Sequence, residues 1–240
     1  MLVEVCANSL QSALNAQEAG ADRIELCSEL AVGGVTPSLG LLKAVREQVD
    51  IPVHVLIRPR SGDFSYSDRE FEIMKTDIAN CLDMGFDGIV SGILHPDFKL
   101  DAERTSELIK ASQGGHFTFH RAFDWVSDPF NVLSLLEDMG ADCILTSGQR
   151  TSAPDGLELL EELNAKASSL TIMPGGGIHP KNASMFREKG FKIIHLSGSR
   201  QVRTLSSPPP VPMNSASLLK EEGISVSNAD RIRKVIKVVR

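Results

Sequence analysis

One short phrase recurs four times along the chain and limits its fold more than any other feature. In each copy a glycine is followed by alanine or phenylalanine, then by aspartate or lysine, and then by an apolar run that contains isoleucine. The four copies lie at 20–26, 85–90, 140–145 and 190–195. Each copy follows an amphipathic stretch of helical periodicity, over 10–19, 70–84, 129–139 and 182–189. Glycine just past a helix supplies a left-handed cap, and a β-branched run then enters a buried strand.

Four further apolar runs lie between these copies, at 3–6, 53–57, 117–120 and 170–173. Helices and strands therefore alternate along the chain in eight βα units, which is typical of an α/β protein with parallel strands. Eight such units close into a (β/α)₈ TIM barrel, and a doubly wound open sheet is the alternative. Because the phrase returns at every second strand, we predict the barrel, as a single domain over residues 1–240.

One segment interrupts this alternation. Residues 201–227 are rich in proline and serine, which disfavours a helix interior, and we expect an exposed loop before a terminal helix at 228–240. The Pro-Pro-Pro-Val-Pro run within it could dock an SH3-like module. A solvated loop is the simpler interpretation, because short proline runs are common in loops.

Composition excludes several classes of partner. A net charge of −6 and a sequence pI of about 5.5 argue against nucleic acid and against an anionic membrane surface. No apolar stretch reaches the roughly 18–20 residues of a membrane-spanning helix. The first residues read as a strand rather than a secretory signal, so we expect a cytoplasmic protein, with the nucleus as a further location. The four cysteines are then expected to be reduced.

Alternation along each predicted strand places polar side chains inside the barrel. Val3 and Val5 face the helices, so their neighbours point inward, and the other strands follow the same rule. The inward set is polar: Glu4, Cys6, Glu25, Cys27, His54, Arg58, Thr118 and His120, with Thr146 and His195 near strand ends. Buried charges are costly unless paired. We therefore expect either an ion pair of Glu4 or Glu25 with Arg58, or a functional site where the strands end.

Two cysteines occupy matching positions on adjacent predicted strands. Cys6 and Cys27 each end a Glu-x-Cys sequence, and neighbouring strands lie roughly 4.8 Å apart. Two thiolates at that separation suit a soft metal such as Cu(I) or Zn²⁺. The spacing of a structural zinc finger is absent from the sequence. The alternative is that both are small apolar core residues.

A glycine-rich loop indicates an anion site. Gly175, Gly176 and Gly177 follow the seventh strand, and loops after strands seven and eight commonly hold phosphate in barrels. Three arginines could add charge to that site: Arg58, Arg60 and Arg200. Alternatively, the glycines only permit a tight turn.

An acid–base pair is also conceivable at the end of the fifth strand. His120 ends that strand, and Asp124 follows in the next loop.

Several motifs together resemble the CutC copper homeostasis family. They are Gly33-Gly-Val-Thr-Pro-Ser-Leu-Gly40, the run from Ile57-Arg-Pro-Arg-Ser-Gly-Asp-Phe to Asp68-Arg-Glu70, Thr118-Phe-His-Arg-Ala-Phe-Asp124, Leu145-Thr-Ser-Gly148 and Met173-Pro-Gly-Gly-Gly-Ile178. The resemblance covers roughly residues 2–200 and weakens beyond Arg200. It implies a TIM barrel and a cytoplasmic homo-oligomer associated with copper tolerance and trafficking.

The resemblance also carries candidate residues. Eukaryotic members are proposed to bind Cu(I) through cysteines that match Cys6 and Cys27, so the chain is identified as a member of eukaryotic type. The polar barrel mouth of the family matches a further set here: Glu4, Glu25, Arg58, Asp63, His120, Arg121 and Asp124.

Three functional hypotheses follow. The first is a copper homeostasis protein that buffers or carries Cu(I) on Cys6 and Cys27, with no organic cofactor. The second is a barrel enzyme for a small anionic or phosphorylated metabolite, with no reaction assigned. Its acid–base candidates are Glu4, Glu25, His120 and Asp124, and its anion would bind to Arg58, Arg60, Gly175, Gly176, Gly177 and Arg200. The third is an interaction scaffold that uses the proline-rich segment at 205–217.

Overall fold

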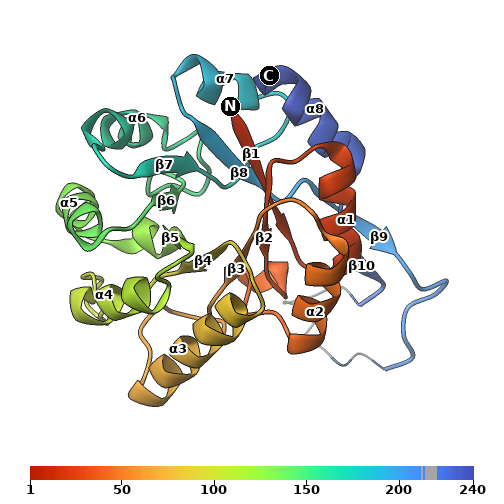
Figure 1. Ribbon diagram of the computed structural model, residues 1–240. Helices are drawn as coiled ribbons and strands as arrows, with labels where there is room; N and C mark the ends of the chain where they lie inside the picture. The colour runs from red at the N-terminus through yellow and green to blue at the C-terminus, as the bar shows by residue number, and fades with distance from the viewer. Residues whose placement is uncertain (212, 214–220) are drawn as a thin grey trace.

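The computed structural model describes residues 1–211, 213 and 221–240, and these form a barrel of parallel strands surrounded by helices (Figure 1). The barrel strands are β1 (Leu2–Ala7), β2 (Arg23–Leu26), β3 (Val53–Leu56), β4 (Gly88–Ser91), β5 (His116–Phe119), β6 (Cys143–Thr146), β7 (Thr171–Pro174) and β8 (Ile193–Leu196). The helices are α1 (Leu10–Ala19), α2 (Leu39–Gln48), α3 (Asp68–Asp83), α4 (Ala102–Ala111), α5 (Pro129–Met139), α6 (Leu157–Lys166), α7 (Ala183–Glu188) and α8 (Ala229–Val239).

Strand order confirms the predicted (β/α)₈ barrel. The eight strands pair in parallel in the order β7-β6-β5-β4-β3-β2-β1-β8. A parallel bridge between Gly175 and His195 then joins the end of β7 to β8 and closes the ring beside its carboxyl-terminal mouth. The open-sheet alternative is therefore excluded.

The recurring Gly-x-Asp phrase has a physical explanation in this arrangement. The carboxylates of Asp22, Asp87 and Asp142 accept hydrogen bonds from the amides of Val3, Val53 and Phe117, at 2.8, 2.9 and 2.7 Å. Each aspartate thus fixes the start of one strand to the strand that follows it in the chain. The preceding glycine ends the helix in the left-handed region, as at Gly20 and Gly140. The phrase therefore pairs strands at the amino-terminal end of the barrel.

Replacing Asp87 with alanine is expected to lower the free energy of unfolding by about 1 kcal/mol, because the Val53 amide loses a charged acceptor. Urea unfolding at neutral pH measures this difference. The matched control is Asp83→Ala, which removes an exposed carboxylate at the end of α3. Equal stability of the Asp87 variant and the wild type would contradict the proposed role.

The predicted inward and outward faces of the strands are confirmed. Val3 and Val5 belong to the large apolar cluster that also contains the buried helix residues. Inside the barrel, Cys6 and Cys27 pack with Leu56 and Val90, and a second interior cluster contains Cys143. The interior also holds buried polar side chains: Glu4, Glu25, His54, Thr118 and His120.

Two glycines at β4 make room for the interior histidines. A Cβ at Gly88 would lie 2.7 Å from the His54 ring, and one at Gly92 would lie 2.6 Å from Nδ1 of His120. The His54 ring stacks on that of His116, with centroids 4.7 Å apart. The absence of a side chain at Gly88 and at Gly92 therefore leaves room for the rings of His54 and His120.

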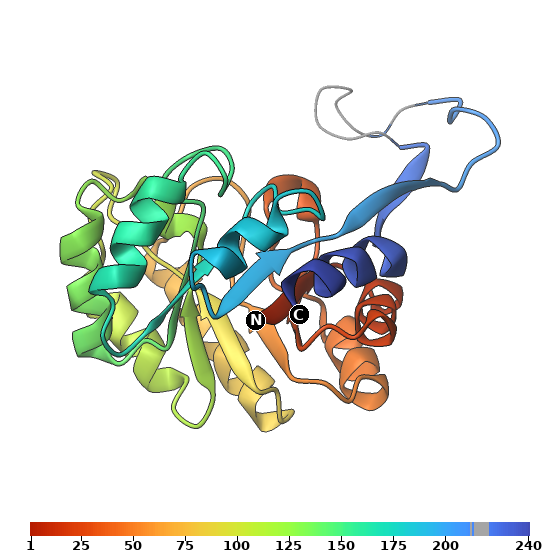
Figure 2. The ribbon, with the colours of Figure 1, turned by 90° about the horizontal axis from the view of Figure 1, so that it is seen from above.

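The segment expected to be a loop over 201–227 begins and ends in strands. β9 (Ser199–Arg203) and β10 (Gly223–Ser227) form an antiparallel hairpin that extends away from the barrel (Figure 2). The amide of Ser227 donates to Ser12 Oγ at 3.1 Å, which anchors the hairpin to α1. These two strands were not predicted, because the segment as a whole is rich in proline and serine. The scaffold hypothesis for 205–217 falls partly on residues outside those described, 212 and 214–217.

Candidate functional site

A pocket of about 500 Å³ opens at the carboxyl-terminal mouth of the barrel. Polar and apolar side chains share its lining: Cys6, Glu25, Leu30, Val32, Gly33, Leu56, Arg58, Gly62, Phe64, His120, Arg121, Trp125, Leu145, Gly176, Gly177, Ile178, His195, Leu196 and Ser197. Its size is that of a small-molecule site, and its position at the carboxyl ends of the strands is where barrel active sites lie.

Cys6 lines this pocket, and Cys27 lies beside it, buried outside the lining. Sγ of Cys6 and Sγ of Cys27 are 3.4 Å apart, and both side chains are buried. The hydrogen bond to Cys27 and burial raise the pKa of Cys6 above its usual value. Because twice a metal–sulfur bond of about 2.3 Å exceeds the separation, both sulfur atoms can reach one ion placed beside them.

Glu25 and His195 complete a possible ligand set around Cys6. One donor atom of each of these three residues lies within 4.8 Å of the others. The Cys6 thiol is 4.0 Å from Glu25 Oε1, and His195 Nδ1 is 3.4 Å from Glu25 Oε2. Burial raises the pKa of Glu25 to about 7. The cluster therefore offers a thiol, a carboxylate and an imidazole to a metal ion.

Glu4 lies below this cluster and is fully buried. Its Oε2 accepts from Arg23 Nε at 2.5 Å, and its Oε1 is 2.7 Å from His195 Nδ1. Burial would raise the pKa of Glu4, but the His195 hydrogen bond and the Arg23 charge hold it well below the usual range. The expected pairing of a glutamate with Arg58 is wrong: the cation is Arg23, which is level with Glu4 in the strand register.

Arg58 lies just beyond β3, the strand that neighbours β2. Its Nη1 donates to the carbonyls of Val32 and Gly34, and its Nη2 to that of Gly62, each at 2.8 Å. Its Nε has no partner, although the side chain is only 4% exposed. Arg58 thus ties loops of the mouth together, and its side chain contributes to the pocket lining.

His120 lies beside Arg58 across the ring of Phe64. Its Nδ1 accepts from the Ala122 amide at 3.2 Å, whereas its Nε2 has no partner. Burial and the nearby Arg58 lower the pKa of His120 to about 3, so the ring is neutral at physiological pH. Because Nδ1 is an acceptor in this neutral ring, Nε2 carries the proton.

Asp124 does not form the expected acid–base pair with His120. Its Oδ1 accepts from Thr146 Oγ1 at 2.5 Å and from the amide of Ser147 at 2.9 Å, and its Oδ2 accepts from Arg121 Nε at 2.7 Å. The carboxylate therefore organises the loop after β6 and holds Arg121, which lines the pocket.

The predicted anion residues separate into two groups. Gly176 and Gly177 line the pocket with Arg58, whereas Gly175 bridges to His195 at the ring closure, where an added Cβ would meet Leu145. Arg60 points to Glu70 and Asp63, at 2.6 and 3.1 Å, and Arg200 is exposed on β9. Neither arginine lines the pocket. Gly176 and Gly177 have φ of +100° and +72°, which explains the glycines by conformation alone.

Three residues of the barrel interior and its mouth were not predicted from the residue pattern. Arg23 precedes Glu25 by two positions on β2, so the alternation rule that placed Glu25 inside also places Arg23 there. Phe64 and Trp125 come from a loop and a short 3₁₀ helix, which carry no such periodicity. Their rings meet edge to face at 4.7 Å and form an apolar wall of the pocket.

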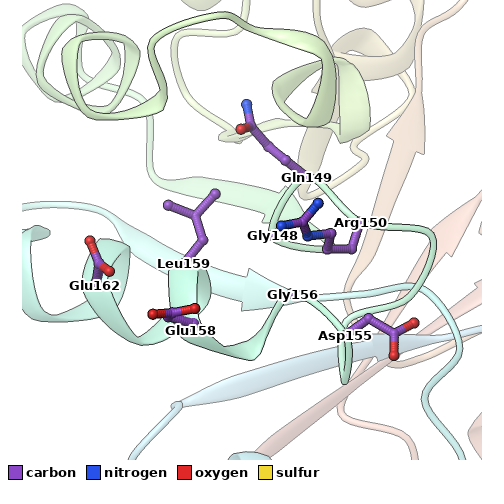
Figure 3. A pocket seen from close by; sticks show the side chains of 8 residues that line it. All are labelled: Gly148, Gln149, Arg150, Asp155, Gly156, Glu158, Leu159 and Glu162. Atoms are coloured by element: carbon purple, nitrogen blue, oxygen red, sulfur yellow. The ribbon is translucent and has the colours of Figure 1, made fainter.

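A smaller depression of about 260 Å³ lies over the start of α6 (Figure 3). It is lined by Gly148, Gln149, Arg150, Asp155, Gly156, Glu158, Leu159 and Glu162. None of these residues lines the mouth pocket, and none is a predicted site residue. The mouth pocket is therefore the candidate site.

Fold and site together define the class of this protein: a (β/α)₈ barrel with a buried, polar, cysteine-containing mouth. The sequence model of the CutC family matches residues 1–200. The family protein CutC of Salmonella enteritidis PT4 is 46% identical over 196 residues, covering 82% of this chain and 79% of its own. A CutC of Erwinia tasmaniensis is 44% identical over 200 residues, covering 83% and 80%. The chain therefore belongs to the CutC family.

Solved structures agree with this assignment. The proposed copper homeostasis protein CutC of Streptococcus agalactiae superposes with a TM-score of 0.78 at 34% identity, covering 82% of this chain and 98% of that one. A proposed phosphonomutase from Burkholderia cenocepacia has a TM-score of 0.60 at 19% identity, covering 81% and 86%, and shares the fold alone. The relatives named here are bacterial, so the eukaryotic-type assignment stays a prediction.

Proposed function

We propose that this protein binds Cu(I) through the thiolates of Cys6 and Cys27 at the barrel mouth and acts as an intracellular buffer or carrier. The observation that carries the proposal is the 3.4 Å separation of the two sulfur atoms, of which that of Cys6 belongs to the pocket lining. Soft thiolates favour Cu(I) over harder ions. The S. agalactiae relative, described as a proposed copper homeostasis protein, supports the same choice.

The surroundings of the sulfur atoms fit a cation. Glu25 and His195 each offer one more donor atom close to Cys6. Leu30 and Leu56 pack around the two cysteines and shield them from water. A buried thiol must lose its proton to bind metal, so binding is coupled to proton release. We infer that copper is cargo at this site rather than a catalyst.

The test is an anaerobic titration of Cu(I) in competition with a chromophoric chelator. We expect the wild type to bind about one equivalent per chain, and the double variant C6S/C27S to bind at least about a hundredfold more weakly. The matched control is C81S/C143S, because these two cysteines are also buried but pack in other clusters, apart from Cys6 and Cys27.

Two outcomes would contradict the proposal. Unchanged affinity of C6S/C27S would remove copper from this site, and equal losses in both double variants would indicate damage to the fold rather than to a ligand pair. Circular dichroism of the wild type and both double variants checks the fold independently.

The cellular location and the self-assembly of this protein are also proposals. We infer a cytoplasmic protein, with the nucleus as a further location, that assembles with copies of itself, as the sequence resemblance implies. Among the described helices, none has the length and apolar character needed to cross a membrane.

A further inference from the structure

A surface loop lies against the buried thiol of Cys27. Cys27 is fully buried, whereas Cys6 beside it lines the mouth pocket. Residues 29–34 form the loop in question, between β2 and α2. A Cβ added to Gly34 at the end of this loop would lie 3.5 Å from Sγ of Cys27. Leu30 near its start packs against the apolar cluster that contains both cysteines. The loop therefore covers the barrel interior at the position of Cys27.

Hydrogen bonds within this loop make it a compact unit. The amides of Val32 and Gly34 both donate to the carbonyl of Glu29, at 3.1 Å. Just outside the loop, Ser28 and Val35 exchange two amide–carbonyl hydrogen bonds of 2.9 Å, which hold its ends together. The first and last residues of the loop have φ of +54° and +88°. A loop that is closed at its base in this way can turn about its end residues and keep its internal hydrogen bonds.

Few contacts hold the loop against the barrel. Among the described residues, Arg58 alone donates side-chain hydrogen bonds to it, from Nη1 to the carbonyls of Val32 and Gly34 at 2.8 Å. Nη2 of the same guanidinium donates to the carbonyl of Gly62, which fixes the arginine to the loop after β3. Leu30 is only half-buried, and the residues that follow it are exposed. Segments with so few buried contacts open at a lower free energy than the whole fold.

We propose that residues 29–34 form a gate that opens to admit a metal ion to Cys27, and that Arg58 is the latch that holds the gate closed. The ion in this inference rests on the proposed function, because binding by both sulfur atoms requires access to a thiol that the closed gate buries. Opening of the gate requires no copper, so it can be measured on metal-free protein. Arg58 is a positioning residue here, because it acts through the loop.

Cysteine labelling measures the opening. In the variant Cys6→Ser the remaining cysteines are Cys27, Cys81 and Cys143, and each is at most 1% exposed. N-ethylmaleimide is a small uncharged reagent that reaches a thiol only when the protein around it opens, and mass spectrometry of peptides gives a rate for each cysteine. We expect Cys27 to react at least about tenfold faster than the other two, which need a wider opening of the fold.

Two substitutions in the Cys6→Ser protein test the latch and the cover separately. Arg58→Met removes both hydrogen bonds to the gate. Gly34→Ala would place a Cβ 2.7 Å from Cδ2 of Leu56, at a φ that alanine rarely adopts, which strains the closed gate. Each is expected to speed labelling of Cys27 at least about tenfold, which corresponds to about 1.4 kcal/mol in the opening equilibrium. Labelling of the other two cysteines should stay unchanged.

Charge and position are controlled by two further variants. Arg58→Lys keeps the positive charge and one donor, so its labelling rate should lie between those of the parent and Arg58→Met. Loss of the charge in Arg58→Met cannot itself speed the reaction, because it lowers the thiolate fraction of a nearby cysteine. Arg60→Met removes an arginine of the same segment that pairs with Glu70 and Asp63, and it should label as the parent does.

Three outcomes would overturn the gate or its latch. Labelling of Cys27 no faster than that of Cys81 and Cys143 would mean that Cys27 is exposed only by wider unfolding. Equal acceleration of all three thiols in Arg58→Met and Gly34→Ala would indicate a loss of global stability. A folded Arg58→Met variant that labels as the parent does would refute the latch. Fast labelling that depends on Arg58, together with unchanged Cu(I) affinity of C6S/C27S, would reject copper as the ligand and support the gate.

Discussion

Replacing Arg23 with methionine is expected to lower the free energy of unfolding by about 3–5 kcal/mol. Arg23 has a side chain 14% exposed, and its Nε lies 2.5 Å from a carboxylate oxygen of Glu4, which is fully buried. Without Arg23, Glu4 keeps only His195 as a partner for its charge. A buried charge that has lost a partner is destabilising, and methionine restores volume but not charge. Urea denaturation at neutral pH measures the loss.

The double variant E4Q/R23M tests the cause. Removing the carboxylate charge together with its partner is expected to recover at least half of the lost stability, because an uncharged amide costs less to bury. Arg233→Met is the matched control: Arg233 pairs with Glu18 and Asp230 at the exposed surface, so we expect a change below about 1 kcal/mol. A loss in Arg23→Met that persists unchanged in E4Q/R23M would indicate lost packing instead of an unpaired charge.

The pair of Glu4 and Arg23 shows which features of the barrel interior can be predicted from the sequence. Alternation along β1 correctly places Glu4 and Cys6 inward, because the side-chain period of a strand is fixed by the backbone. The partner of Glu4 depends on the register between neighbouring strands. Glu4 is level with Arg23, whereas Arg58 lies two residues beyond the end of β3. The sequence of a single strand does not determine its register with the next strand. Alternation therefore predicted that Glu4 faces the interior but not that Arg23 pairs with it.

Loops account for the rest of what the sequence could not predict. Phe64 and Trp125 form a pocket wall, yet neither lies on a strand or an α-helix whose periodicity would orient it. Arg60 and Arg58 are two positions apart, but Arg60 bends outward to Glu70, the residue that also closes the capping box of α3. The ion pair with Glu70 therefore holds the Arg60 side chain away from the pocket. Two-residue spacing predicts a shared face only while the backbone stays extended.

Protonation of two interior histidines is expected to destabilise the protein in acid. Burial, aided by the Arg23 charge, lowers the pKa of His54 to about 3, and burial with the Arg58 charge lowers that of His120 to about 3. In the unfolded chain both rings take up a proton near pH 6.5. Each therefore contributes stability that is complete above about pH 6.5 and is lost as the pH falls toward about 3, at up to about 1.4 kcal/mol per pH unit.

The protonation of Glu25 has the opposite effect on the stability of the fold, so variants are needed to measure the contribution of the two histidines separately. Its pKa is raised to about 7, and the folded state therefore gains stability as the pH falls through that value toward the unfolded pKa of about 4.3. This contribution is common to the wild type and to His54→Asn and His120→Asn. The difference between proteins then reports the histidines alone, with up to about 2 kcal/mol expected from each between about pH 6.5 and pH 5.

Urea midpoints of the wild type, both single variants and the double variant give this difference directly. We expect each substitution to flatten the dependence of stability on pH below about pH 6.5, with additive effects, since His54 lies on β3, His120 follows β5, and their rings contact different residues. Above about pH 7.5 all four proteins should show parallel curves, because neither ring is protonated there in either state. Identical slopes in acid would mean that the folded protein protonates these rings as readily as the unfolded chain does, and that water reaches the interior of the barrel mouth.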